Sequence, residues 1–241
     1  MARKPSRSGA RRSTSPAAPA VAGTPREKII AAFMALLAEK SIEAIGLGEV
    51  AERADVSLAD LRSEFSSTLA ILAAHVKELD RQVLAGSTAD MEEEDARERL
   101  FDVVMRRLEL LASHKAAVRS LIRSARGNPP LAFALNAMTV RSQQWMLTAA
   151  GIGASGPKGM VRSQGMALLF ANVLRTWVED DDDQTKTLAA LDNELARGQR
   201  FAGLLDQVCR IPEAACAFSE RLRSARRSAR HDRGDEDHAT A

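Results

Sequence analysis

Apolar residues recur at steps of three and four along most of the chain, the spacing that places them on one face of an α-helix. Runs in which apolar and polar residues alternate, as in a half-buried strand, are nearly absent, and the chain has no tyrosine. The pattern predicts an all-α protein. The expected helices cover residues 25–40, 47–54, 58–64, 67–84, 96–112, 115–126, 131–149, 160–178 and 184–208.

Polar residues mark the ends of the first helices. Thr24 precedes Pro25, a favoured first helical residue, and Glu27 follows three residues after Thr24, as in a capping box. Ser57 is the expected N-cap of helix 58–64. Asp55 falls between two short helices, where a tight turn needs a positive φ that Asp tolerates. With small Ala51 where two helices would approach, and with Val50, Val56, Leu61 and Phe65 turned inward, this segment predicts a helix-turn-helix.

Charge divides the chain more sharply than the overall net charge of +2 suggests. Residues 1–23 hold five Lys or Arg and no acid, residues 24–85 have a net charge of −3, and residues 221–231 hold five Arg and no acid. The acidic stretch 86–96 indicates a hinge. We therefore expect a disordered basic arm (1–23), a helix-turn-helix domain (24–86), a helical ligand-binding and dimerisation domain (92–208) and an amphipathic, then basic tail (209–241) whose end is disordered.

Motifs for chemistry are weak. Gly151–Gly156 reads G-x-G-x-x-G, but a helical pattern and not a strand precedes it, so we expect a turn and no nucleotide site. The acidic run 179–183 is typical of a helix start, with Asp183 as the cap. Cys209 and Cys216 have no neighbouring histidines, which argues against zinc and for reduced thiols in the cytoplasm. His75 is expected at the surface or at a domain seam. No catalytic triad, metal site or cofactor motif is discernible, so we expect a protein that is not an enzyme and has no cofactor.

Residues 26–72 resemble the N-terminal domain of the TetR family of transcriptional regulators. The likeness lies in the amphipathic first helix, the AERADVS turn at 51–57, and Leu61, Phe65 and Ser67 with the apolar run behind them. It implies an all-helical homodimer that binds operator DNA through its N-terminal domain and a small molecule through its C-terminal domain. In that family the last two long helices form the dimer interface, and helices of about 160–178 and 184–208 fit that role.

The same resemblance implies the DNA-binding residues, which are Ser57, Leu58, Ala59, Asp60, Arg62, Ser63, Ser67 and Thr68. The family usually has a basic residue, a glycine, a small hydroxyl residue and a tyrosine where this chain has Leu58, Ala59, Asp60 and Arg62. Glu64 adds a second carboxylate to the same helix. Because phosphate contacts supply much of DNA affinity, these departures weaken the expectation, whereas Arg62 and the basic arm support it.

Residues 98–200 carry a second resemblance, to the lipid-binding accessory protein of coenzyme Q (ubiquinone) biosynthesis, a non-DNA-binding protein with a TetR-like fold. It implies an isoprenoid or lipid ligand, a dimer and a terminal helix that docks on membranes, for which residues 201–230 are the candidate. The positions that carry the likeness are Trp145, Gly151, Gln164, Gly165, Trp177, Asp180 to Asp183, Thr187, Leu191, Asp192 and Gly198.

A lipophilic ligand would need an apolar pocket, and methionine suits flexible ligands. The candidate lining residues are Met105, Leu108, Phe133, Met138, Trp145, Met146, Met166, Phe170 and Trp177, although plain core is the more ordinary role for any single one of them. Two functions thus remain open, a ligand-responsive regulator that binds operator DNA as a homodimer, and a lipid-binding accessory protein with peripheral membrane contact. The three-helix scaffold and the basic arm make the regulator the leading hypothesis.

Overall fold

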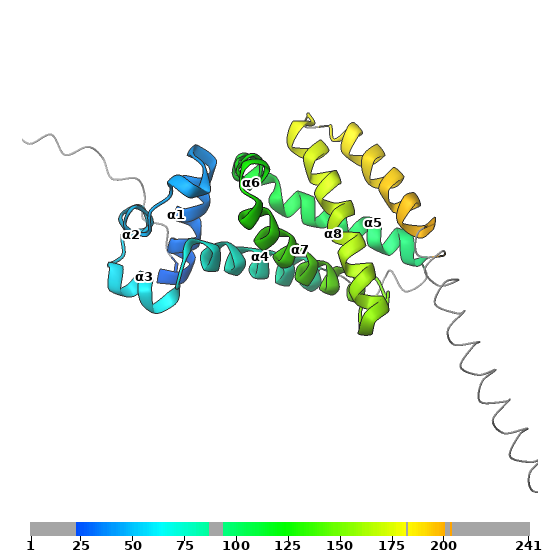
Figure 1. Cartoon of the computed structure of the whole chain (residues 1–241), viewed down its shortest axis with the longest axis horizontal. Coiled ribbons are helices and arrows are strands. Elements are labelled where there is room, and N and C mark those ends of the chain that lie inside the picture. The colour runs from blue at the N-terminus through cyan, green and yellow to red at the C-terminus, as the bar shows by residue number, and fades with distance from the viewer. Residues whose placement is uncertain (1–22, 87–93, 182, 201–202, 204–241) are drawn as a thin grey trace, which may run out of the picture.

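The computed structural model describes residues 23–86, 94–181, 183–200 and 203, and these residues contain helices and no strand (Figure 1). This confirms the all-α prediction. The elements are α1 (Pro25–Glu39), η1 (Ile42–Ala44), α2 (Leu47–Ala54), α3 (Leu58–Glu64), α4 (Thr68–Ala85), α5 (Ala96–Leu111), η3 (Ala112–His114), α6 (Lys115–Gly127), α7 (Pro129–Ala149) and α8 (Gly156–Glu179). One more helix follows at residues 185–200.

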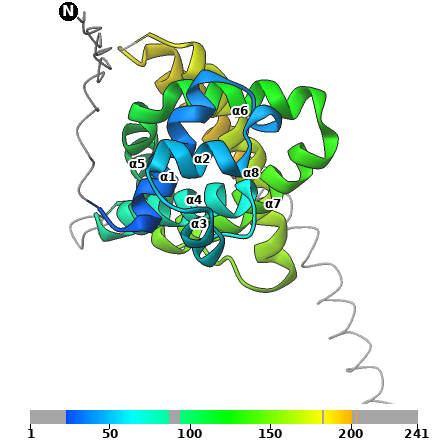
Figure 2. The same ribbon diagram turned by 90° about the vertical axis from the view of Figure 1, so that its left-hand side faces the viewer.

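Helices α1, α2 and α3 form one end of the molecule, which we call the head, and α5 to α8 with helix 185–200 form the larger body (Figure 1). Helix α4 begins in the head and runs along the body beneath α7. Figure 2 shows the molecule from the side of the head, so that α1, α2 and α3 lie in front of the helices of the body. One long helix therefore belongs to both parts.

Two apolar clusters stabilise this arrangement. The first joins α1, α2, α3 and the start of α4, and it also includes Ala117 of α6 and Leu131 of α7. The second joins the later part of α4 to α5, α6, α7, α8 and helix 185–200. Because body residues complete the head's core, the two parts share packing. The predicted domain boundary at residue 86 stays a prediction.

The predicted helices agree with the structure to within one or two residues wherever their ends are described, with α8 as the main exception, and the predicted end at residue 208 lies outside the described residues. It begins at Gly156, four residues before the expected start, and Pro157 occupies its first turn. A proline is well tolerated there because the first N–H groups of a helix have no partner within it. Because this stretch is rich in glycine, the sequence pattern did not predict the first turn of α8.

In the C-terminal half of α7, the side chain of Trp145, an expected pocket residue, is not in the interior. Trp145 is 56% exposed, whereas Ser142, Gln143, Met146 and Leu147 are buried. Helix α7 contacts α4, α5, α6 and α8, so neighbours cover several of its sides. Apolar spacing alone does not select one buried face on such a helix.

The segment Gly151–Gly156 forms the turn between α7 and α8, as expected. Gly151 ends α7 with a φ of 72°, and Gly156 opens α8 with a φ of 69°, both in the region that favours glycine. At the other end of α8, Asp183 accepts a bond from the Thr185 N–H at 3.3 Å. The buried Asp180 adds a stronger anchor, since it accepts bonds from the N–H and the hydroxyl of Thr187, each at 2.7 Å.

Several predictions fall outside the described residues. These are the basic arm up to residue 22, most of the acidic hinge, both cysteines and the tail from residue 204 onward. Within the described part of the chain, no helix is long and apolar enough to span a bilayer. The same residues include no group of three His, Cys, Asp or Glu placed to hold a metal ion.

Candidate DNA-reading helix and ligand cavity

The turn between α2 and α3 has the geometry that the sequence predicts. Asp55 lies in the left-handed region at φ 53° and ψ 50° and ends α2. The Val56 N–H then donates to the Ala51 carbonyl at 3.1 Å, and the Ala51 side chain is buried between the helices. Val50, Leu61 and Phe65 are buried as expected, and Val56 packs against the same core. Together these contacts fix α3 as the exposed second helix of a helix-turn-helix.

The start of α3 is closed by a capping box. The Ser57 hydroxyl accepts from the Asp60 N–H at 3.0 Å and donates to the Asp60 carboxylate at 2.6 Å. That carboxylate also accepts from the Ser57 N–H at 3.3 Å. Further along, the Ser63 hydroxyl donates to the Asp60 carbonyl at 2.7 Å. Three of the eight predicted DNA-binding side chains therefore have hydrogen-bond partners inside α3 itself.

The second acid of α3 is paired with α1. Arg26 lies 3.3 Å from the Glu64 carboxylate, and its guanidinium also stacks 4.8 Å above the ring centre of Phe65. Arg53 of α2 similarly pairs with Glu39 of α1, and the pKa of Glu39 is lowered, chiefly by that hydrogen bond. Exposed pairs of this kind add little stability. They do neutralise carboxylates close to the face that would meet a polyanion.

The outward face of α3 is left with one cation and two apolar side chains. Leu58 is 59% exposed and Ala59 is exposed, whereas Arg62 is exposed with no ion pair among the described residues. At the start of α4, the Ser67 hydroxyl accepts from the Ala70 N–H at 3.1 Å, and Thr68 is half-buried. Arg62 can contact a phosphate or a guanine edge, and Leu58 can contact a thymine methyl group.

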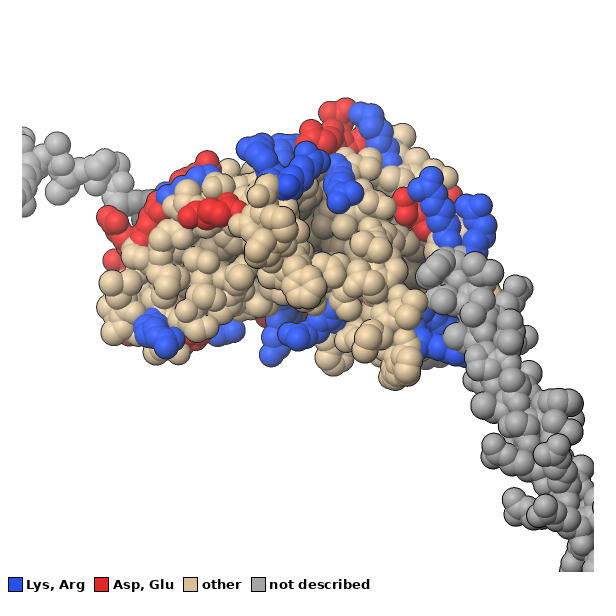
Figure 3. All heavy atoms as spheres, viewed as in Figure 1, with Lys and Arg blue, Asp and Glu red and all other residues tan. Residues whose placement is uncertain are grey.

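Basic side chains gather elsewhere as well. On the face drawn in Figure 3, the largest group of Lys and Arg lies over α6 and not over α3. On α6, Lys115, Arg119 and Arg123 follow at steps of four. Lys115 and Arg119 donate to the backbone carbonyls of Asp180, the C-cap of α8, and of Val178 in its last turn. Two of these cations therefore hold α6 against the end of α8.

The body contains an apolar cavity of about 370 Å³ between α4, α5, α6, α7 and α8, closed on the head side by Met34 of α1. This volume lies in the range of about 300–1,000 Å³ that small-molecule pockets show. Of the nine predicted pocket residues, Met138 and Phe170 line it. Exposed Arg126 and Arg175 also contribute, so the cavity reaches the surface at its α6 and α8 side.

The other predicted pocket residues lie elsewhere. Leu108, Met146 and Trp177 are buried in the core, and Met105 is half-buried against it. Met166 lines a separate cavity of about 420 Å³ between α5, α7, α8 and helix 185–200. Phe133 and Trp145 are 77% and 56% exposed. Apolar periodicity finds buried side chains, but it does not distinguish those beside a void from those packed on all sides.

The sequence pattern did not place polar residues in the cavity. His75 of α4, expected at the surface or at a domain seam, is half-buried, lines the cavity, and packs edge-on against His114 at 4.8 Å between ring centres. Desolvation first, and then the charges of His114 and Arg107, lower the pKa of His75 to about 4. A histidine within the apolar pattern Leu72, Val76, Leu79 was the available signal.

Beside His75, a buried polar network links three helices. Arg107 of α5 forms an ion pair with Asp80 of α4, and the Ser142 hydroxyl of α7 donates to the same carboxylate at 2.7 Å. The Arg107 guanidinium also lies 5.3 Å from the centre of the Phe170 ring. Arg107 lines the cavity, so its charge stands beside the void but is already balanced.

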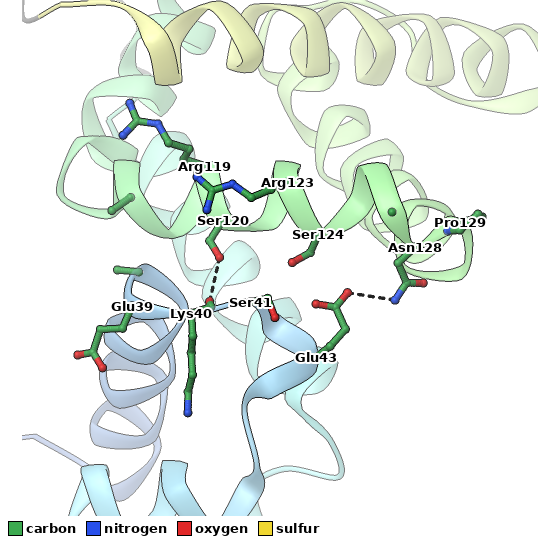
Figure 4. A pocket seen from close by; sticks show the side chains of 13 residues that line it. Glu39, Lys40, Ser41, Glu43, Arg119, Ser120, Arg123, Ser124, Asn128 and Pro129 are labelled. Atoms are coloured by element: carbon green, nitrogen blue, oxygen red, sulfur yellow. Dashed lines mark hydrogen bonds between the residues drawn. The ribbon is translucent and has the colours of Figure 1, made fainter.

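A polar pocket of about 680 Å³ lies where the head meets α6 (Figure 4). The Ser120 hydroxyl of α6 donates to the Lys40 carbonyl at the end of α1 at 2.9 Å. The Asn128 amide donates to the Glu43 carboxylate of η1 at 3.1 Å. The pKa of Glu43 is lowered by a backbone hydrogen bond and by this amide. These two bonds fasten the head to α6.

The positions behind the coenzyme Q resemblance mostly have structural explanations. Trp177, Thr187 and Leu191 are buried, and Asp180 bonds Thr187. A hydrogen bond from that hydroxyl is the main cause of a lowered pKa of Asp180. The Gln164 amide exchanges two bonds of 3.1 Å with Asn136. These residues pack the body, and none of them lines the cavity next to His75.

No protein-family model matches the sequence, and no curated protein matches it. Solved structures do match. A TetR transcriptional regulator from Nitrosomonas europaea aligns with a TM-score of 0.58 and 22% identity over 73% of this chain and 99% of its own.

Two further structures agree. A putative TetR-family regulator from Syntrophomonas wolfei aligns with a TM-score of 0.53 and 15% identity, over 74% of this chain and 94% of its own. A TetR-family regulator from Streptomyces coelicolor gives 0.51 and 13%, over 76% and 83%. The coenzyme Q resemblance finds no support among these structures and stays a prediction. The chain has the fold of the TetR family of transcriptional regulators.

Proposed function

We propose that the protein is a ligand-responsive transcriptional regulator that binds operator DNA as a homodimer. The observation that carries the proposal is the intact helix-turn-helix, with Asp55 in the turn and α3 exposed along its outer face. An apolar cavity in the body supplies the second part that such a regulator needs. The solved structures of the same fold are described as transcriptional regulators.

The acidic recognition helix is compatible with this function because its carboxylates have partners within the head. Asp60 closes the capping box, and Glu64 pairs with Arg26. Arg62 then provides the positive charge on the exposed face of α3. We expect DNA affinity to depend on Arg62 together with the basic arm, and to fall steeply with salt.

Communication between cavity and head follows from the helices that they share. His75 and Leu72 of α4 line the cavity, and the first turn of α4 lies next to α3. Leu121 and Ile122 of α6 also line it, and Ser120 of the same helix bonds the end of α1. A ligand that fits one arrangement of α4 and α6 better than another shifts the position of the head.

The dimer contact is proposed on α8 and helix 185–200. Leu168 of α8 is 56% exposed and Leu188 is 39% exposed, whereas the opposite sides of both helices are in the core. Large apolar side chains that are exposed on two adjacent helices favour contact with a second protein molecule. Size-exclusion chromatography with light scattering would show a monomer if Leu168→Glu breaks this contact.

A gel-shift titration against the DNA upstream of the protein's own gene, at several salt concentrations, tests DNA binding. Wild-type protein should form a specific complex, and Arg62→Ala should weaken it about tenfold or more and reduce the salt slope by about one unit. Lys77→Ala is the matched control, because it removes one exposed positive charge from α4 outside the helix-turn-helix. An affinity that does not depend on the DNA sequence, or that is the same for Arg62→Ala as for the wild type, contradicts the proposal.

Glu64→Gln provides the opposite test on the same helix. The substitution removes a negative charge and frees Arg26, so it should tighten operator binding, most visibly at low salt. The lipid-binding alternative predicts another result for the wild-type protein. A co-purified isoprenoid in native mass spectrometry, with liposome binding lost on deleting residues 201–230, would favour it.

A further inference from the structure

His75 is a polar group of the cavity whose hydrogen bonding is incomplete. The residue is half-buried and lines the void between α4 and α8, and its buried Nε2 atom has no hydrogen-bond partner among the described residues. A buried polar atom without a partner costs about 1–3 kcal/mol, so such atoms in proteins are usually paired with protein, water or ligand. The ring touches His114 edge-on but gains no hydrogen bond from it in the structure.

Three other polar lining side chains already form hydrogen bonds or an ion pair, although the Nε atom of Arg107, like His75 Nε2, has no hydrogen-bond partner among the described residues. Arg107 is paired with Asp80, and the Thr139 hydroxyl donates to the Leu135 carbonyl at 2.9 Å. Asn136 exchanges bonds with Gln164. Each of these side chains can stay as it is with the cavity filled by apolar atoms. Of these four side chains, His75 and Arg107 each have an atom to which a ligand can supply a partner, and the charge of Arg107 is already balanced by Asp80.

The charge of the groups around His75 limits what that partner can be. Arg107 lies on one side with its charge balanced by Asp80, and His114 lies on the other with its own pKa lowered by burial. Glu78 is held by Arg81, whose side chain donates to it at 2.6 Å. Among the described residues that line the inner end of the cavity there is no unbalanced cation, so a ligand carboxylate there would be an uncompensated buried charge.

We propose that the cavity binds an apolar molecule carrying a neutral hydroxyl or carbonyl group, and that His75 Nε2 forms a hydrogen bond with that group. The inference rests on the proposed function, since it names the ligand class of the same regulatory cavity. An apolar body fits the lining supplied by Leu79, Leu135, Met138 and Phe170. The far end of the molecule faces the opening beside Arg126 and Arg175.

The test uses the full-length dimer at pH 7.5 and three probes of similar length, 1-decanol, 2-undecanone and decanoate. Each probe competes with the fluorescent reporter N-phenyl-1-naphthylamine. The alcohol and the ketone should compete at concentrations roughly tenfold lower than decanoate, because one hydrogen bond to a neutral group is kept and no charge is buried.

Variants separate His75 from the rest of the cavity. His75→Phe should weaken decanol about tenfold and leave the reporter's own affinity within about twofold, since the aromatic volume is retained. His75→Gln, which keeps a hydrogen-bonding group, should recover most of the loss and covers the case in which the phenylalanine variant misfolds. Thr148→Val is the matched control, because this exposed α7 hydroxyl donates to the Gln144 carbonyl at 2.8 Å outside the cavity, so its loss should not affect decanol.

Three results would overturn the inference. They are decanoate competing as well as decanol, His75→Phe binding decanol like the wild type, and no probe displacing the reporter. Gel shifts on the same preparations distinguish this failure from that of the proposed function. Specific DNA binding without the expected probe binding would support the proposed regulator function and contradict the proposed ligand class. Probe binding without DNA binding does the reverse.

Discussion

The head and the body differ in where their polar side chains find hydrogen-bond and ion-pair partners. In the head, the cap of the reading helix α3 is formed by residues close in sequence, Ser57 and Asp60 three residues later. In the body, the buried polar network joins Asp80, Arg107 and Ser142, which come from three helices. The Arg53–Glu39 pair of the head is exposed, whereas the Arg107–Asp80 pair of the body is buried. A site made from one short segment can be recognised from sequence, whereas one assembled from five helices cannot.

The largest expected difference lies between the two kinds of ion pair. Asp80→Ala leaves Arg107 buried without a counter-charge, so it should lower the free energy of unfolding by about 3–5 kcal/mol. Arg53→Ala removes an exposed pair of the head and should have a far smaller effect. Urea unfolding measures both.

An apolar replacement sharpens this comparison. The double variant Asp80→Leu with Arg107→Met should recover much of the loss, because it removes both charges and not one. Equal destabilisation by Asp80→Ala and Arg53→Ala would show that the pair is not buried in solution, and the contrast between head and body would fail.

The buried histidine of the body makes stability depend on pH. His75 has a pKa of about 4 in the folded protein and an ordinary value of 6.5 when unfolded. Between these values the unfolded state binds more protons, so stability is full above about pH 7 and falls by about 3 kcal/mol as the pH drops to about 4.

Thermal unfolding of wild type and His75→Phe across this range checks the effect. The variant lacks the titrating group, so the difference between the two proteins should grow in its favour as the pH falls. His114, Arg107 and Glu78 act on the same ring and are present in both proteins. A difference that stays constant with pH would mean that the imidazole is not buried as described.

Two glycines on α8 give an intermediate effect. A Cβ on Gly159 would fall on the backbone of Ala154, whereas a Cβ on Gly165 would meet nothing within 4 Å. Gly159→Ala should therefore destabilise the body by about 1–3 kcal/mol. Gly165→Ala should stabilise it by about 0.5–1 kcal/mol through helix propensity. Urea unfolding measures both changes in the free energy of unfolding. If they have opposite signs, the backbone of the turn before α8 packs directly against the first turns of that helix.

The capping box of the head gives the smallest expected change. Ser57→Ala removes the hydroxyl that bonds the Asp60 N–H and should cost about 1 kcal/mol. Ser66→Ala, at an exposed position between α3 and α4, should leave stability unchanged. If the two variants unfold alike, the cap adds nothing measurable and the order of α3 comes from packing alone.

The sequence by itself determined the helices, the caps at Thr24 and Ser57, and the turn at Asp55. Each depends on groups within a few residues of one another, and the structure has them as predicted. It did not reveal that Glu64 has a partner, because Arg26 lies 38 residues away from it. That contact changes how the acidic helix is interpreted.

Only the tertiary structure decided which body residues surround a void. Met138 and Phe170 line the cavity while Trp177 is core and Trp145 is exposed, although all four follow the same helical spacing. The difference depends on how α4 to α8 pack, which local periodicity does not encode. The burial of His75 without a partner arises in the same way, because burial is a property of the neighbours and not of the residue.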